Sequence, residues 1–329
     1  MTIRNFCILA IACLMSAAAN AREAAGAAPP VQSGPPEMVV TLLGTSTPDL
    51  SERRFGFSVL VQAGGLNLVF DAGRGAAIRL GQLRMRPSEV DAVFLTHFHS
   101  DHINGLADLW MTGYLGAGRN GRKMPLELYG PHGTEKLARG MMETYQADAT
   151  IRFADEPSAL PASRIAARDA APGVVFERAG VKVTMFQVFH GAEIEPAMGY
   201  RVDYAGRSVT LSGDTQPHPN VEKFGAGADV LIHEVALAPG DIELTPRIRE
   251  VLAHHTSPEE AGALFRRAAP RLAVYSHISR LPGPRGRATL EDLVKRTRTA
   301  YAGPLAVGED LMRIRIGEGI SILQMQDNF

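Results

Sequence analysis

A dense group of metal-ligating side chains lies in the segment THFHSDH at residues 96–102. The segment directly follows a short apolar run that is typical of a buried strand. In extended backbone, His97 and His99 point to the same side and can hold one cation, while a turn after them can direct Asp101 and His102 toward a second. A polar loop that happens to be histidine-rich is the alternative, but its position directly after a buried strand favours a metal site.

Further histidine and aspartate residues also follow apolar, strand-like runs: Asp71, His190, Asp214 and His277. Both cysteines, Cys7 and Cys13, lie in an N-terminal segment that we expect to be removed. Metal binding by the mature chain would therefore depend on nitrogen and oxygen ligands.

This pattern resembles the metallo-β-lactamase superfamily, whose signature is His-x-His-x-Asp-His, and the resemblance runs from about Leu42 to the C-terminus. It implies an α/β fold, a four-layer αβ/βα sandwich, holding two Zn²⁺ ions, with Mn²⁺ or Fe as alternatives. It also implies that Asp71 orients the histidine loop without binding metal. The implied ligands are His97, His99, His190 and Asp214 for one metal, and Asp101, His102, Asp214 and His277 for the other.

Several short motifs resemble the ribonuclease Z branch of this superfamily: TLLGT, LYGP, GDT, LIHE, SHIS and HTSPEEA. In that branch a histidine pairs with the glutamate after a late strand, which here would be His255 with Glu234. The resemblance implies that this pair delivers a proton to the leaving group, and a structural ion pair is the alternative. Two neighbouring cations activate a water for attack, and Asp101 or Asp214 could take its proton.

The substrate that we expect is a small phosphodiester or related anionic ester. Enzymes that trim transfer RNA carry a long arm between the third histidine and the bridging aspartate, whereas only 24 positions separate His190 from Asp214 here. Lys plus Arg (34) nearly equals Asp plus Glu (35), so the overall charge does not favour nucleic acid. We therefore predict that the protein does not process transfer RNA.

Other functions are compatible with the same ligands. An exported aryl or alkyl sulfatase or a carboxylic esterase is the first alternative. A β-lactamase is a weaker one, because many of those enzymes have Cys, or no acidic bridge, where this sequence has Asp214. A non-catalytic metal-binding module would have no reason to keep every ligand together with His255 and Glu234. The branch also leads us to expect a homodimer.

Residues after the histidine cluster are the sequence's candidates for the substrate pocket. Arg119 and Lys123 could meet an anionic group, and Trp110 or Tyr114 an aromatic one. A solvated loop with one buried aromatic residue is the alternative.

The remaining histidines have structural interpretations. We expect His132 to be a capping or surface residue, His233 to be buried and hydrogen-bonded, and His254 to be the solvent-side neighbour of His255. His218 lies in a loop near the site and could touch substrate.

The elements between these residues alternate between strands and helices. We predict helices at about 75–83, 132–145 and 257–269, a Gly-Gly hairpin turn at 64–65, and an Ala/Pro-rich loop at 155–172. Two strand-rich halves that each carry helices predict two sheets packed face to face, with the helices outside.

The N-terminus has the features of an export signal. Arg4 precedes an apolar run from Phe6 to about Ala19, and Ala-Asn-Ala at 19–21 fits a cleavage site. The run is shorter than the roughly 20 residues of a membrane span, so we expect no stable membrane anchor after cleavage; a lipoprotein modified at Cys13 is a minor alternative. We expect a signal at 1–21, a flexible lead-in at 22–37, the hydrolase domain at 38–329, and a periplasmic or secreted protein.

Overall fold

The computed structural model describes residues 37–116, 120–155, 160–240, 244–284 and 286–323. The expected signal and nearly all of the lead-in lie outside these ranges, so both stay predictions. The first described residue, Glu37, forms an ion pair with Arg315 at 2.8 Å. Among the described residues, the helices are too short or too polar to cross a membrane.

One sheet has eight strands in the order β17-β16-β1-β2-β3-β4-β5-β6. The predicted turn at Gly64 and Gly65 joins β2 to β3, and both glycines have positive φ. Strands β3 to β6 run parallel, so the residues that follow them gather at one edge of the sheet. The strands are β1 (Met38–Gly44), β2 (Ser58–Ala63), β3 (Leu66–Phe70), β4 (Ala92–Phe94), β5 (Leu126–Gly130), β6 (Ile165–Asp169), β16 (Arg313–Ile316) and β17 (Ile320–Leu323).

The other large sheet has seven strands in the order β15-β12-β11-β10-β9-β8-β7. Strands β10, β11, β12 and β15 are parallel, and β8 and β10 both pair antiparallel with β9, so β8 runs in the same direction as β10. The carboxyl ends of β8, β10, β11 and β12 therefore lie at a common edge. The strands are β7 (Gly173–Arg178), β8 (Val181–Val188), β9 (Ala197–Tyr204), β10 (Arg207–Leu211), β11 (Val230–Leu237), β12 (Leu272–Arg280) and β15 (Leu305–Val307).

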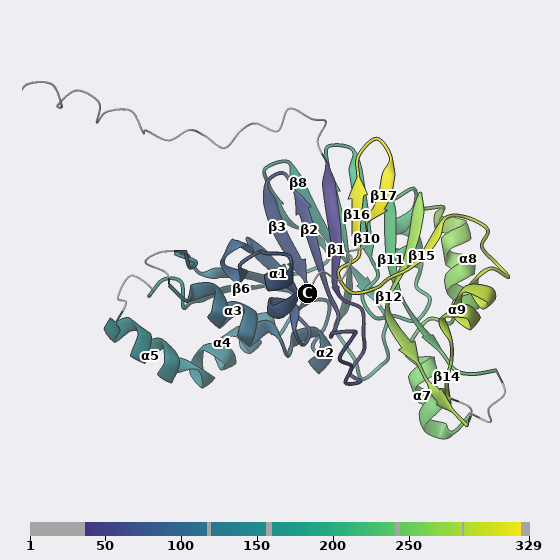
Figure 1. The fold of residues 1–329 in the computed structure, drawn as a ribbon, viewed down its shortest axis with the longest axis horizontal. Coiled ribbons are helices and arrows are strands. Elements are labelled where there is room, and N and C mark those ends of the chain that lie inside the picture. The colour runs from purple at the N-terminus through teal and green to yellow at the C-terminus, as the bar shows by residue number, and fades with distance from the viewer. Residues whose placement is uncertain (1–36, 117–119, 156–159, 241–243, 285, 324–329) are drawn as a thin grey trace, which may run out of the picture. The chain divides into compact units, whose positions relative to one another are not determined.

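Three apolar clusters define four layers. Alternate residues of both sheets, such as Val61 and Phe94 on one and Val202 and Ile232 on the other, form the central core. Helices α1 (Ala76–Gln82), α3 (Leu106–Tyr114) and α4 (Thr134–Thr144) cover the outer face of the eight-stranded sheet. Helices α6 (Pro219–Gly225), α8 (Pro258–Ala268) and α9 (Leu290–Thr297) cover the other sheet, and Figure 1 shows the two helical layers on opposite sides. The predicted αβ/βα sandwich is confirmed.

The expected helices at 75–83, 132–145 and 257–269 correspond to α1, α4 and α8. The prediction of a loop over 155–172 was wrong in part, because β6 (Ile165–Asp169) pairs with β5 in it. β6 is an edge strand in which only Ile165 is buried, so the apolar alternation that marks a strand is weak there. Further elements that the sequence did not indicate are α6, α9, β7, β15, β16, β17, a 3₁₀ helix at Pro87–Glu89, α2 (Ser100–Ile103), α5 (Gln146–Asp155), α7 (Pro246–Ala253), β13 (Pro282–Gly283) and β14 (Gly286–Arg287).

Candidate active site

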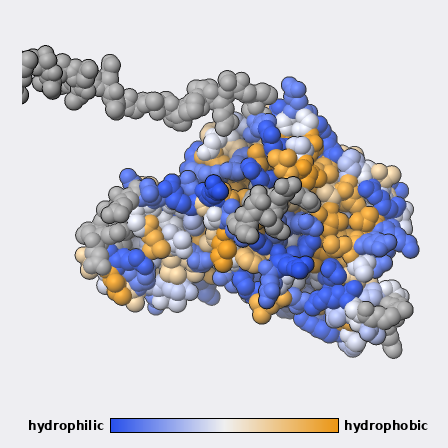
Figure 2. All heavy atoms as spheres, viewed as in Figure 1, coloured by the Kyte–Doolittle hydropathy of each residue, from blue (hydrophilic) through white to orange (hydrophobic). Residues whose placement is uncertain are grey.

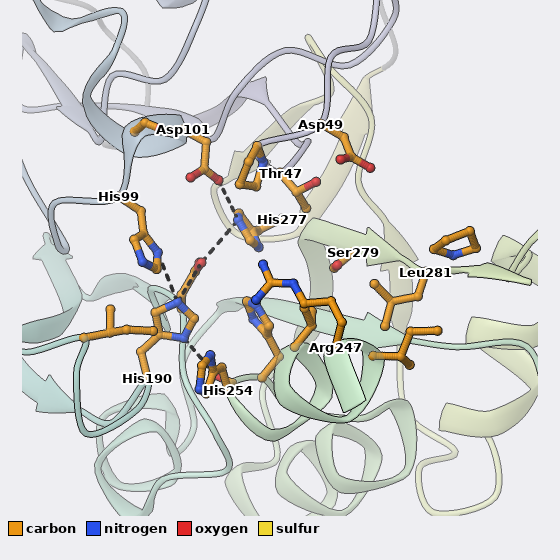
Figure 3. Close-up of a pocket in the computed structure, with 18 of the residues that line it drawn as sticks. Thr47, Asp49, His99, Asp101, His190, Arg247, His254, His277, Ser279 and Leu281 are labelled. Atoms are coloured by element: carbon orange, nitrogen blue, oxygen red, sulfur yellow. Dashed lines mark hydrogen bonds and ion pairs between the residues drawn. The ribbon is translucent and has the colours of Figure 1, made fainter. Parts of the chain in front are cut away.

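The histidine and aspartate residues singled out in the sequence meet at the edge where the strands of both sheets end. His97 and His99 follow β4, and Asp101 and His102 lie on the short helix α2. His190 follows β8, Asp214 follows β10 and His277 lies within β12. Figure 3 shows the side chains of His99, Asp101, His190 and His277 converging from these segments.

A β-bulge directs His277 toward this edge. In the pairing of β11 with β12, Ser276 and His277 together oppose the single residue Glu234. His277 has a φ of 48°, in the left-handed region that non-glycine residues seldom adopt. Bulges re-aim side chains and are common beside active sites, which explains how a residue in a buried strand can face the cluster.

Asp214 lies at the centre of the cluster. Its Oδ2 atom is 3.2 Å from His277 Nε2, 3.4 Å from His102 Nε2, 3.7 Å from His190 Nε2 and 4.0 Å from His97 Nε2. Two ligands of a tetrahedral zinc ion, each about 2.0 Å from it, lie roughly 3.3 Å apart. The separations therefore match those between atoms that share a metal ion.

The residues fit a metal centre in a second respect. Several buried polar atoms of the cluster have no hydrogen-bond partner in the described chain: His97 Nε2, His102 Nε2, Asp101 Oδ1 and Asp214 Oδ1. Buried polar atoms without partners are costly and rare, and coordination of cations would satisfy atoms of this kind. Ligand atoms within 4.8 Å of one another form three sets: His97, His99, His190 and Asp214; Asp101, His102 and His277; and Asp214, His255 and His277.

Charges within the cluster are mutually dependent. Burial disfavours the charged form of Asp214, but His277 and His102 outweigh it and hold the pKa of this carboxyl well below its usual value. Burial likewise opposes the charge on His102, while Asp214 and Asp71 raise its pKa well above the ordinary value. Burial lowers the pKa of His97, and neighbouring His102 lowers it further. Asp214 thus supplies negative charge and His97 a neutral imidazole, two ligand types that divalent transition metals take.

Asp71 orients residues of the cluster through hydrogen bonds. It is fully buried at the end of β3, where its carboxylate accepts hydrogen bonds of 2.7 Å from the Thr96 backbone N–H and from the Thr96 hydroxyl. A third contact of 2.7 Å joins its Oδ2 to His102 Nδ1. This contact holds the proton of His102 on Nδ1 and leaves Nε2 directed at the cluster.

His190 is oriented by backbone. Its Nδ1 donates to the carbonyl oxygen of His254 at 2.8 Å, so its Nε2 faces Asp214. Burial lowers the pKa of His190 to about 4, which keeps the ring neutral and able to bind a cation.

His255 and Glu234 form the pair expected from the sequence. His255 Nδ1 lies 2.9 Å from Glu234 Oε2, and the other carboxylate oxygen accepts from the Thr256 backbone N–H at 2.8 Å. Burial opposes a charge on His255, but Glu234, Asp214 and Asp101 raise its pKa to about 9. The His255 ring lies 4.8 Å from that of His190, so its free nitrogen belongs to the same site.

A cavity of about 580 Å³ opens from the cluster to the surface. Sequence reasoning missed three of its walls: the loop at 47–49, helix α7, and the segment from Ser279 through β13 to β14. Figure 3 shows Arg247 reaching from α7 into the cavity, with Thr47 and Leu281 on other sides. The element α7 is only eight residues long, and the sequence did not indicate it.

The expectations for pocket residues were mostly wrong. Trp110 and Tyr114, four positions apart on α3, are each 1% exposed and pack in the core between α3 and its sheet. Lys123 is exposed and does not line the cavity. Arg119 lies outside the described residues.

The remaining histidines take varied positions. His132 is exposed beside Asp169, and His218 caps α6 by accepting from the Asn220 backbone N–H at 3.2 Å, outside the cavity. His233 is buried and hydrogen-bonded to a backbone carbonyl, as predicted. The expectation for His254 was wrong, because this residue is half-buried and lines the cavity.

Comparison with known proteins agrees with this geometry. The protein-family model for the β-lactamase superfamily domain matches residues 66–278 of this chain. A ribonuclease Z of Mycobacterium sp. (strain KMS) is 34% identical over 285 residues, which cover 86% of this chain and 98% of the relative. This chain belongs to the metallo-β-lactamase superfamily. Within the superfamily it belongs to the ribonuclease Z-like branch, and it is a metal-dependent hydrolase.

Solved structures of the superfamily share the fold. The metallo-β-lactamase fold protein YhfI from Bacillus subtilis superposes with a TM-score of 0.65 at 18% identity, covering 85% of this chain and all of that one. The short form of human tRNase Z has a TM-score of 0.61 at 21% identity, covering 84% and 98%.

Proposed function

We propose that this chain is a dinuclear zinc hydrolase that cleaves a phosphodiester or a related anionic ester of small size. The convergence of four imidazoles on Asp214 Oδ2 is the observation that carries the proposal. Asp214 would bridge two ions. The first would be held by His97, His99, His190 and Asp214, and the second by Asp101, His102, Asp214 and His277.

Zinc fits this set because it accepts histidine nitrogen and carboxylate oxygen together, and manganese or iron would be the alternatives. A pair of bound cations would lower the pKa of a water and offset negative charge on the ester oxygens. Asp101 and Asp214 line the cavity and would accept the proton of the attacking water.

His255 would protonate the leaving group. Its Nδ1 is held by Glu234, so the proton on its other nitrogen faces the cavity. Since Glu234 is 2% exposed and also accepts from the Thr256 N–H, its position is set by two hydrogen bonds. The pair is therefore oriented before substrate binds.

A small substrate is favoured over transfer RNA. All residues between His190 and Asp214 are described, and they form one connecting loop and the hairpin of β9 and β10 within the sheet. No arm extends from this part of the chain to grip a large nucleic acid. Export to the periplasm or beyond, which the N-terminal pattern indicates, would also separate the protein from transfer RNA precursors.

Cleavage of RNA is the second candidate, because the curated relatives at 34% identity are named ribonuclease Z. A direct assay would distinguish the small anionic ester from RNA as the substrate. Purified mature protein would be given bis-p-nitrophenyl phosphate, p-nitrophenyl sulfate, p-nitrophenyl acetate, a chromogenic cephalosporin and a transfer RNA precursor, and its metal content measured.

Two metals per chain with turnover of the phosphodiester would support the proposal. Asp214→Ala should lose both, while Asp203→Ala, a half-exposed aspartate on β9, should keep both. Preference for the sulfate, carboxylic ester or lactam would move the function to that class, and specific 3′ trimming of the precursor would establish RNA as the substrate. Less than one metal per chain without turnover would favour a binding module.

A homodimer is also proposed. Figure 2 shows hydrophobic side chains at the surface over β15, β16 and β17, and Ile322 and Leu323 of β17 are 39% and 44% exposed. Edge strands with exposed apolar residues are often covered by a partner. Light scattering on the mature protein would give its mass in solution, and a monomer would contradict this proposal.

A further inference from the structure

One wall of the cavity is aliphatic and comes from three separate segments. Ile194 lies in the loop after His190, Ile248 and Val251 lie on α7, and Leu281 follows β12. These four side chains line the same cavity as the proposed metal ligands. A substrate held at the ligands would therefore have this wall beside it.

The burial of the α7 residues shows that this wall lines the cavity and is not part of the hydrophobic core. Amphipathic helices normally turn their apolar face to the protein interior. None of the α7 residues is buried or belongs to the three apolar clusters, and Ile248 and Val251, three positions apart, are half-buried and line the cavity. Their apolar surface is left for a ligand to cover.

The cationic side chains at this end of the cavity do not form a continuous positive surface that would bind a polyanion. Arg287 on β14 is paired with Asp49 at 2.8 Å, and Arg247 on α7 is hydrogen-bonded to Glu250 at 2.9 Å. Each of these cationic side chains thus has an acidic partner. A volume of about 580 Å³ is in the range of sites for small organic ligands.

We infer that the substrate is an anionic ester that carries an apolar alkyl or aryl group, which packs against Ile194, Ile248, Val251 and Leu281 while the ester lies at the histidine and aspartate cluster. The inference rests on the proposed ester hydrolysis and adds the class of organic group. Burial of each additional methylene on this wall should raise kcat/KM about fourfold until the wall is filled.

A series of p-nitrophenyl alkyl phosphate diesters tests this inference, with methyl, ethyl, propyl and butyl groups and a constant leaving group. In the zinc-loaded wild-type protein kcat/KM should rise along the series. In Ile248→Asn and in Val251→Thr, which nearly preserves shape, the butyl-to-methyl ratio should fall severalfold. Leu252→Asn is the matched control, because Leu252 is also half-buried on α7 but does not line the cavity, and it should keep the wild-type ratio.

Equal kcat/KM for all four esters, or the same rise in Ile248→Asn as in wild type, would overturn the inference while ester hydrolysis stands. Should no ester be cleaved, the proposed function fails, and calorimetric titration with methylphosphonate and butylphosphonate still decides the inference. Tighter binding of butylphosphonate that is lost in Ile248→Asn would support it. Equal affinity, or no binding of either, would refute it.

Discussion

Replacing Asp71 with asparagine should weaken one of the two proposed metal sites without disturbing the backbone. Asp71 has a φ of 55°, which asparagine tolerates, and the amide oxygen can still accept from the Thr96 N–H. The amide NH₂ would then face His102 Nδ1, where Oδ2 now accepts at 2.7 Å. His102 would have to accept at Nδ1, which moves its proton to Nε2, the atom directed at the proposed metal.

The expected loss of metal affinity follows from the lost contact between Asp71 and His102. A hydrogen bond to a charged group contributes about 1.5–3 kcal/mol, and 1.4 kcal/mol corresponds to a tenfold change in affinity. This agrees with the roughly 10–100-fold loss that follows removal of a partner that orients a metal ligand. We expect the affinity of the site containing Asp101, His102 and His277 to fall by about this factor, and the other site to change less.

Competition titration with a zinc chelator would measure both affinities. Asp203→Asn, at a half-exposed position on β9, is the matched control and should bind as wild type. Circular dichroism would establish that both variants are folded. Wild-type affinity at both sites in a folded Asp71→Asn protein would refute this account of His102.

Three further results are expected. Removal of metal by a chelator should abolish hydrolysis and lower the melting temperature, and added zinc should restore both. The melting temperature should fall because zinc at 100 times its Kd stabilises a folded protein by about 2.7 kcal/mol. An unchanged melting temperature would contradict this. Glu234→Gln should lower kcat about 10–100-fold with little change in KM, since His255 would lose its orientation, whereas a purely structural pair would alter only thermal stability. Asp310→Ala should reduce the free energy of unfolding in urea by about 3–5 kcal/mol, because it leaves the buried Arg79 without its carboxylate at 2.8 Å; a loss below about 1 kcal/mol would be inconsistent with this.

The cluster itself was predictable because its residues are marked by type and local position. His97, His190, Asp214 and His277 each lie in or directly after an apolar strand-like run, and parallel strands bring such ends to one edge of a sheet. The Gly64-Gly65 turn and helices α1, α4 and α8 were also predictable, since turn chemistry and helical periodicity are local properties.

The pocket could not be predicted in the same way. Trp110 and Tyr114 are close to the histidines in sequence, yet α3 directs both into the core, while Ile248 and Leu281 are distant in sequence and face the cavity. Chain proximity does not determine which face of a helix is buried, because that depends on the sheet it packs against.

The amino-acid sequence by itself determined the superfamily, the metal-ligating residue types and the alternation of strands and helices, because each is encoded in short segments. The tertiary structure alone decided which nitrogen of His102 faces the cluster, how a bulge turns His277 out of β12, and which side chains of α7 form the cavity wall. These features depend on contacts between residues separated in the chain, such as Asp71 with His102 and Glu234 with His255, and such contacts exist only once the segments that carry them have packed together.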